Sequence, residues 1–271
     1  MPFHTDEAPY RFRQGTAPLL ISMPHVGTYV PPALAARFTE EARRVPDTDW
    51  HLERLYDFAD ELGASVLIAT HSRYVVDLNR PPDDQNLYPG QDTTGLCPVD
   101  TFDKTPIYAA GDVPDAAEIA ERVEAVWRPY HAKLQEELTR LKALHGAVGL
   151  WDAHSIRSVL PRFFEGKLPD LNLGTAGGAS CAPGMAEQLL AIAQAEPRFT
   201  SVLNGRFKGG YITRRYGKPV DSVQVVQLEL TQATYMTEQW PFKYQPDRAA
   251  EVSPVLRRML LAALEWVPHG E

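Results

Sequence analysis

Short apolar runs that end on polar residues constrain the fold of this chain more than any other feature. The run 147–151 leads to Asp152 and His154, and the run 19–23 leads to His25. An apolar run of this length is typical of a strand that is buried on both faces of a parallel sheet. Ligands of open α/β sheets bind at the carboxyl ends of the strands. The two histidines are therefore predicted to meet at one edge of a sheet as ligands of one metal.

Composition indicates a globular protein and argues against several other classes. The chain has 271 residues, 44% hydrophobic and 23% charged, which suffices for a substantial core in one large α/β domain or two small ones. We expect a single domain, residues 1–271. The net charge of −8 argues against nonspecific nucleic-acid binding. We find no signal-peptide pattern and no apolar run of about 18 residues, so no membrane span is expected. Only Cys97 and Cys181 are present, which favours a cytoplasmic protein without a disulfide framework.

Further apolar runs and helical periodicity predict the remaining elements. Strands are expected at 65–70, 170–175 and 223–230. Helices are expected at 31–44, 46–62, 114–145, 184–195 and 246–266. The stretch 202–217 has paired glycines and basic residues, and we expect a hairpin or loop pressed close to a ligand. Alternating strands and helices predict an α/β fold.

Acidic residues supply the other candidates for the site. An aspartate such as Asp49, at the start of a predicted helix, is most often a helix cap, and the functional alternative is that it shares a metal with His25. Asp47 is the other carboxylate open to that role. Glu229 stands inside an apolar strand, where a carboxylate is costly to bury unless it is paired, near a metal or protonated. Because zinc hydrolases combine three nitrogen or oxygen ligands with a separate carboxylate, we assign His25, Asp49 and His154 to the metal and Glu229 to acid–base work.

The segment 71–84 carries charged residues among apolar ones, and it has two interpretations. It can be a solvated edge strand with surface salt bridges. Alternatively, Arg73 and Arg80 form a bidentate clamp for a carboxylate, with Asp77 and Asn79 holding the two guanidinium groups. The second interpretation predicts a small anionic ligand despite the negative charge of the whole chain.

Eight short segments, spread from Pro18 to the last helix, form a recognisable set. They are Ser22–Gly27, Asp47–Trp50, Arg73–Arg80, Thr94–Pro98, Trp151–Ser155, Asn172–Thr175, Lys208–Thr213 and Gln227–Leu230. Together they resemble the N-formylglutamate amidohydrolase family, and the Thr-Asp-Trp and Thr-Gly-Leu-Cys-Pro segments resemble its histidine-degradation branch. The resemblance implies a fold similar to zinc carboxypeptidases and aspartoacylase, with a mixed, mostly parallel sheet between helices.

The resemblance also implies an activity, namely metal-dependent hydrolysis of N-formyl-L-glutamate to formate and L-glutamate in histidine degradation. Zinc, or another divalent transition metal such as cobalt, is then expected on His25, Asp49 and His154, with Glu229 moving the proton. One departure concerns Thr28, which stands three residues after His25 where the carboxypeptidase-like pattern has a glutamate. The carboxylate ligand is therefore expected from one of the two aspartates described above.

A dianionic substrate needs more than one cation. We expect Arg73 and Arg80 to bind its carboxylates, with Arg214 next and Asn79 beside them, while Asp152 supports a metal ligand. Two other functions compete with this prediction: a related zinc amidohydrolase that acts on another N-acyl amino acid or short peptide, and a non-catalytic carboxylate-binding protein. A serine hydrolase is disfavoured, because the chain has no Gly-x-Ser-x-Gly elbow.

Overall fold

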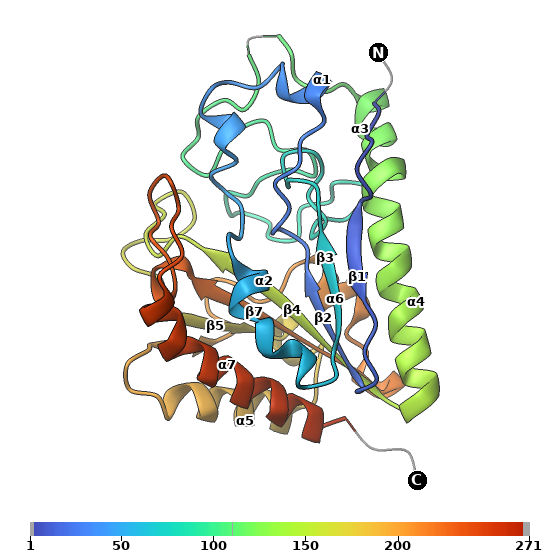
Figure 1. Cartoon of the computed structure of the whole chain (residues 1–271), viewed down its shortest axis with the longest axis vertical. Coiled ribbons are helices and arrows are strands. Elements are labelled where there is room, and N and C mark those ends of the chain that lie inside the picture. Colours follow the sequence, from blue (N-terminus) through green and yellow to red (C-terminus); the bar gives the residue numbers. More distant parts are fainter. Residues whose placement is uncertain (1–2, 110, 268–271) are drawn as a thin grey trace.

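A seven-stranded sheet forms the centre of the computed structural model, which describes residues 3–109 and 111–267 (Figure 1). The strands are β1 (Tyr10–Arg13), β2 (Leu19–Met23), β3 (Ser65–Ala69), β4 (Val148–Ile156), β5 (Leu171–Gly174), β6 (Ser201–Leu203) and β7 (Val223–Thr231). Their order is β1-β3-β2-β4-β7-β5-β6, and only the β1–β3 and β5–β7 pairs are antiparallel. The predicted α/β fold with a mixed, mostly parallel sheet is confirmed.

The helical segments differ widely in length. The α-helices are α1 (Pro32–Ala35), α2 (Leu52–Leu55), α3 (Ala116–Arg122), α4 (Arg128–His145), α5 (Pro183–Gln194), α6 (Tyr211–Tyr216) and α7 (Pro246–Glu265). The 3₁₀-helices are η1 (Ala42–Arg44), η2 (Asp57–Asp60), η4 (Ala176–Gly178), η5 (Pro219–Asp221) and η6 (Gln232–Thr234), and η3 (Val123–Trp127) is a π-helix. Within residues 3–109 and 111–267, no helix is both long and apolar enough to cross a membrane.

Helices cover both faces of the sheet, and Figure 1 shows α4 along one side with α5 and α7 together along another. Neighbouring residues of one strand serve opposite faces: Leu150 packs in the core under α4, whereas Trp151 packs in the core under α2, α5 and α7. Val225 and Val226 of β7 divide in the same way. This alternation follows from the strand geometry, and it explains why the strands are continuous apolar runs.

The long helix predicted at 114–145 is confirmed as a nearly continuous rod, in which α3, the π-helical turn η3 and α4 follow one another without a gap. The strands predicted at 65–70, 170–175 and 223–230 and the helices at 184–195 and 246–266 are also confirmed, with ends that differ by a residue or two.

Two predicted helices near the amino terminus are largely wrong. The segment 31–44 is helical only in α1 and η1, because Thr39 N bonds to Ile107 O and Phe38 packs edge-on against Tyr108. The segment 46–62 is helical only from Leu52, since its first residues run as a turn beside the site. Contacts with distant segments therefore override the local helical pattern.

Two further local predictions need correction. The segment 71–84 is not an edge strand, because its backbone forms turns and its two valines are buried. The stretch 202–217 is not a hairpin: residues 204–210, between β6 and the helix α6, form the loop that was the other alternative, and Arg206 and Gly210 of this loop line the pocket described below. Asn79 explains the helix: its backbone oxygen accepts from Tyr211 N over 3.2 Å and its Oδ1 accepts from Ile212 N over 2.8 Å. A remote residue thus satisfies free N–H groups at the start of α6.

Candidate metal centre and substrate pocket

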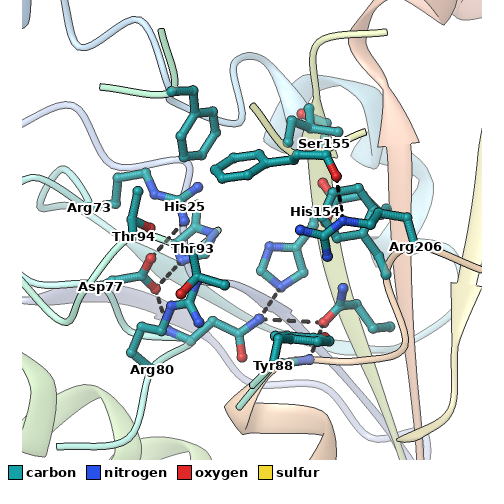
Figure 2. Close-up of a pocket in the computed structure, with 18 of the residues that line it drawn as sticks. His25, Arg73, Asp77, Arg80, Tyr88, Thr93, Thr94, His154, Ser155 and Arg206 are labelled. Carbon is teal, nitrogen blue, oxygen red and sulfur yellow. Dashed lines mark hydrogen bonds and ion pairs between the residues drawn. The ribbon is translucent and has the colours of Figure 1, made fainter. Parts of the chain in front are cut away.

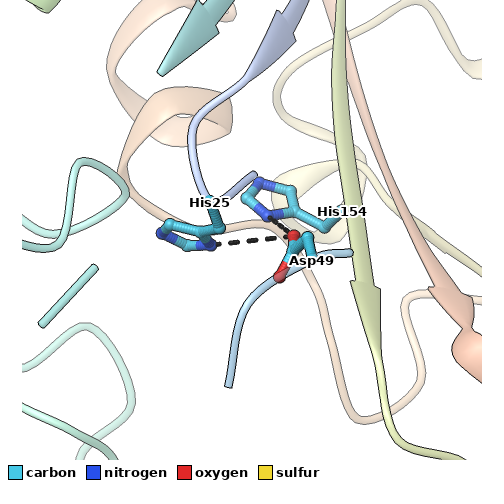
Figure 3. A group of neighbouring side chains, drawn as sticks. All are labelled: His25, Asp49 and His154. Atoms are coloured by element: carbon cyan, nitrogen blue, oxygen red, sulfur yellow. Dashed lines mark ion pairs between the residues drawn. The ribbon is translucent and has the colours of Figure 1, made fainter. Parts of the chain in front are cut away.

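Two neighbouring parallel strands bring the predicted histidines together. β2 ends at Met23, just before His25, and β4 carries His154 near its carboxyl end. Ser22 pairs with Asp152 in parallel register, so both strands end at the same edge of the sheet. The two imidazole centroids are 4.8 Å apart, with their planes tilted by 58° (Figure 3). The strand-end histidines therefore meet as the sequence pattern predicts.

Asp49 completes a group of three potential ligands. Its Oδ2 lies 3.3 Å from His154 Nδ1 and 3.9 Å from His25 Nδ1, and all three side chains are buried. One ligand atom from each residue lies within 4.8 Å of the others. Backbone hydrogen bonds fix this carboxylate, since Asp49 N donates to His25 O over 3.0 Å and Ser155 N donates to Asp49 Oδ2 over 3.0 Å.

This group fits a divalent cation. Two imidazole nitrogens and one carboxylate oxygen are ligand types that zinc takes in hydrolases, where three protein ligands leave a position open. Asp49 Oδ1 is buried and has no hydrogen-bond partner in the described part of the chain, which is unusual for a polar atom unless an ion satisfies it. Although burial opposes a charged ring, Asp152 and Asp49 raise the pKa of His154 well above its ordinary value. The surroundings therefore favour positive charge at this point.

The alternatives for the two aspartates are resolved by their positions. Asp49 does not cap a helix, because α2 begins at Leu52 with His51 as its N-cap residue. Asp47 faces away from the histidines: it accepts hydrogen bonds from Tyr74 Oη over 2.5 Å and from Phe102 N over 2.8 Å. The helix-cap interpretation is therefore wrong, and Asp49 supplies the carboxylate beside the two imidazoles.

Each histidine has a carboxylate on the ring nitrogen that faces away from Asp49. His25 Nε2 donates to Asp77 Oδ1 over 2.7 Å, and His154 Nε2 lies 3.1 Å from Asp152 Oδ2. Asn79 Nδ2 is 3.0 Å from the same nitrogen of His154. Carboxylate partners of this kind orient metal-binding imidazoles, and the hydrogen bond from His25 to Asp77 also selects the tautomer of His25. Both Nδ1 atoms face the space beside Asp49.

Glu229 stands next to this group because its strand, β7, pairs with β4. Glu229 is directly opposite His154 in the parallel register, and its side chain lines the pocket although the residue is only 8% exposed. Burial raises the pKa of Glu229 to about 8, against the opposing charge of His154. Its carboxyl group can therefore exchange a proton near neutral pH, which is the property a general acid–base catalyst needs.

Figure 2 shows the pocket beside the histidines, which is lined by three arginines, Arg73, Arg80 and Arg206. Arg73 donates to Asp77 Oδ2 over 2.6 Å, and its guanidinium carbon lies 4.8 Å from the centre of the Phe102 ring. In residues 3–109 and 111–267, no ion pair joins Arg80 or Arg206 to a carboxylate. The pocket thus offers two guanidinium groups whose charge the protein does not balance directly.

The sequence pattern selected Arg214 for this pocket, but the structure brings Arg206 there instead. Arg214 is exposed on α6, where its Nε donates to Gly209 O over 3.0 Å and its guanidinium lies over Tyr88, and it does not line the pocket. Arg206 belongs to the same basic stretch. The only signal for it was its place just before the Gly209-Gly210 pair, which lets the backbone approach closely.

Two further histidines and both cysteines serve structural contacts. His71 contacts Thr5, and His131 is buried against α6. Cys97 and Cys181 are free and buried, and burial raises the pKa of each thiol to about 11. None of these residues lines the pocket.

Comparisons with known proteins identify the family of this chain. Residues 17–236 match the sequence model of the family described as N-formylglutamate amidohydrolase. The chain is 56% identical to an N-formylglutamate deformylase of Pseudomonas aeruginosa over 94% of this chain and 96% of that protein. It is 52% identical to one of Pseudomonas putida over 94% of this chain and 95% of that protein.

A solved structure resembles the whole fold. It is an N-formylglutamate amidohydrolase from Ralstonia eutropha JMP134, which matches with a TM-score of 0.82 and 26% identity over 96% of this chain and 98% of that one. Because the family model covers most of the chain and two relatives are more than half identical across nearly all of it, the chain belongs to the N-formylglutamate amidohydrolase family.

Proposed function

We propose that this protein hydrolyses N-formyl-L-glutamate to formate and L-glutamate, with a divalent metal held by His25, Asp49 and His154. The observation that carries the proposal is the convergence of three buried ligand atoms beside Glu229 and an arginine-lined pocket. The names of the two Pseudomonas relatives, both N-formylglutamate deformylases, support the substrate. Zinc suits the nitrogen and oxygen ligands, and cobalt is the expected substitute.

A divalent metal, when bound, would polarise the formyl oxygen and lower the pKa of a water molecule. The chain supplies the rest of the metal environment. Asp49 brings a negative charge to the site, a hydrogen bond to Asp77 holds His25 with its Nδ1 directed inward, and Asp152 lies 3.1 Å from His154 Nε2. All of these carboxylates are buried, so their orientation does not depend on solvent.

Glu229 carries the proton. Its carboxylate takes a proton from the attacking water and returns it to the glutamate nitrogen as the bond between the formyl carbon and that nitrogen breaks. Formate and L-glutamate, with its amino group now free, are then released. Burial raises the pKa of Glu229 to about 8, which favours the protonated form that acts as the acid, while the charges of His154 and Arg73 favour the ionised form that acts as the base.

Arginines bind the substrate. N-formyl-L-glutamate carries two carboxylates, and guanidinium groups bind carboxylates in a bidentate geometry. Arg80 is available in the pocket, and Arg73 contributes positive charge next to the metal group. Asn79 precedes Arg80 in the sequence, and its side chain contacts His154. It therefore connects the segment that carries Arg80 to the metal centre.

Formate release tests this function. We would follow formate produced from N-formyl-L-glutamate before and after chelation, with N-acetyl-L-glutamate and N-formyl-L-aspartate as comparison compounds. Activity that chelation abolishes, that zinc or cobalt restores and that is confined to N-formyl-L-glutamate is the expected result. Metal-dependent hydrolysis of another compound instead would show that the proposed substrate is wrong. Hydrolysis unaffected by complete metal removal would show that the proposed metal dependence is wrong.

A cytoplasmic location, a role in histidine degradation and a single-domain organisation stay predictions.

A further inference from the structure

Two arginines reach the pocket from segments that lie far apart in the sequence. Arg80 follows β3 in the turn-rich segment 71–84, whereas Arg206 precedes α6. Figure 2 shows the two arginines on opposite sides of the view. Arg73, in contrast, already has a carboxylate partner, Asp77, at 2.6 Å. Because neither Arg80 nor Arg206 forms an ion pair within the described ranges, each guanidinium is free to bind a separate anionic group.

The guanidinium of Arg206 is held in a fixed direction by neutral contacts. Its Nε donates to Phe163 O over 2.6 Å, and one terminal nitrogen contacts Asp92 O at 3.4 Å. Its guanidinium carbon lies 5.2 to 5.8 Å from the ring centres of Phe207, Tyr88 and Phe163. These contacts orient the group and reduce its hydration without cancelling its charge, which strengthens its attraction for a carboxylate.

Two acids act on Arg206 through their charge, Glu229 and Asp92, and neither forms an ion pair with it in the described part of the chain. Asp92 already has other partners. The carboxylate of Asp92 is 2.8 Å from Lys104 Nζ and 3.0 Å from an Arg162 nitrogen. Burial and the charge of Arg80 lower the pKa of Arg206, so the two arginines repel each other in the pocket. A dianion that lies between them removes this repulsion, whereas a monoanion satisfies only one of them.

Arg80 is held by its backbone and its neighbours close to the three proposed metal ligands, His25, Asp49 and His154. Its neighbour Asn79 lies 3.0 Å from His154 Nε2, and its own backbone N donates to Asp77 O over 3.2 Å. Trp127 Nε1 donates to Arg80 O over 3.0 Å, which fixes the segment from the side of the π-helix. An α-carboxylate is attached to the same carbon as the reacting nitrogen, so it must also lie close to the metal group.

We propose that Arg206 is a specificity-determining residue that binds the side-chain carboxylate of the substrate, while Arg80 binds the α-carboxylate. The assignment rests on the proposed function and extends it, because it predicts how the pocket distinguishes substrates. An acidic side chain pairs with Arg206, whereas a neutral amide of the same shape leaves that guanidinium without a counter-charge. The pocket therefore selects N-formyl amino acids with a second negative charge.

Two substrates and two variants test this assignment. The substrates are N-formyl-L-glutamate and N-formyl-L-glutamine, which differ in the side-chain charge but hardly in shape. In Arg206→Gln, kcat/KM for the glutamate compound should fall by about 10- to 100-fold, the loss expected for a hydrogen bond to a charged group, mainly through KM. The glutamine compound should change only a few-fold, so the preference disappears. In Arg80→Gln, both substrates should lose efficiency together, because both carry the α-carboxylate.

Controls separate this effect from a loss of folding. Arg215→Gln removes the same charge from an exposed arginine on α6 outside the pocket, and it should leave both substrates close to wild type. Arg206→Lys keeps the charge and should restore part of the preference for the glutamate compound. Equal losses on both substrates in Arg206→Gln, or an unchanged preference in the folded variant, would overturn the assignment.

Binding of the reaction products separates this proposal from the catalytic one. Calorimetry of L-glutamate and L-glutamine with the metal-loaded protein needs no hydrolysis. If the wild type binds L-glutamate more tightly and Arg206→Gln loses only that preference, the role of Arg206 holds even where no formate is released. If the wild type hydrolyses N-formyl-L-glutamate but the variant keeps its preference in both assays, the proposed function holds and the role of Arg206 does not.

Discussion

His131 contacts segment 71–84, which carries Arg80, and we predict that it makes the stability of the folded protein sensitive to acid. Its ring stacks on Trp127, with centroids 3.8 Å apart, and its Nε2 donates to Leu78 O over 2.8 Å. Nδ1 is 2.9 Å from Tyr216 Oη, which donates to it. Burial lowers the pKa of His131 to about 3, the charge of Arg215 adds to the effect, and the hydrogen bond to Leu78 opposes it.

The stability change follows from the difference between the folded and unfolded pKa values. An unfolded histidine has a pKa of about 6.5, so below that pH the unfolded chain binds a proton that folded His131 does not accept. The contribution to stability is present above about pH 6.5 and is lost as the pH falls toward about 3. Between about pH 7 and pH 5 the loss amounts to about 2 kcal/mol. This figure depends mainly on the unfolded pKa, because folded His131 is still neutral at about pH 5.

Urea unfolding of metal-free wild type and His131→Gln, each at about pH 7, 6 and 5, isolates this effect. Glutamine can still donate to Leu78 O but does not titrate. The variant should be less stable than wild type at about pH 7, and the gap in unfolding free energy should shrink by about 2 kcal/mol at about pH 5. Because all other titrating groups are common to both proteins, they cancel in the difference. A gap that stays constant over this range would refute the reasoning.

Three further changes test the site and the backbone around it. Asp77→Asn removes the carboxylate on His25 Nε2, so metal affinity, measured by competition with a chelator, should weaken about 10- to 100-fold, and unchanged affinity would contradict its supporting role. Glu229→Gln should lower kcat by about 10²- to 10⁴-fold at unchanged metal content, whereas a rate within a few-fold of wild type would exclude it as the proton carrier. In Gly27→Ala the new Cβ would lie 2.2 Å from His71 O, so thermal unfolding should report a destabilisation of about 1–3 kcal/mol, and an unchanged Tm would show that this backbone can move.

The strands and the strand-end histidines were predictable because their signal is local. A parallel sheet covered on both faces needs continuous apolar runs, and each run is broken where polar side chains enter the site. His25, His154 and Glu229 therefore stand out, each beside or inside a run of buried residues. The long helix before β4 was predictable for the same reason, because its apolar residues recur at helical spacing.

Other features depend on contacts that are remote in the chain. The sequence left Asp47 and Asp49 as alternatives, since both lie in one turn, and only the packing of that turn against β2 and β4 directs Asp49 to the histidines. The helix predicted at 31–44 is interrupted because Thr39 N bonds to the distant Ile107 O, and the helix predicted at 46–62 starts late because Asp49 N bonds to the distant His25 O.

The class of fold, the two strand-end histidines and the buried glutamate could be read from the sequence, because burial and strand ends leave a local pattern of apolar and polar residues. The packing of distant segments selects which aspartate joins the histidines and which arginine of the basic stretch, Arg206 or Arg214, enters the pocket. These choices depend on the direction in which a turn or loop packs against the rest of the chain. That direction is set by contacts between segments far apart in the sequence, which no local pattern records.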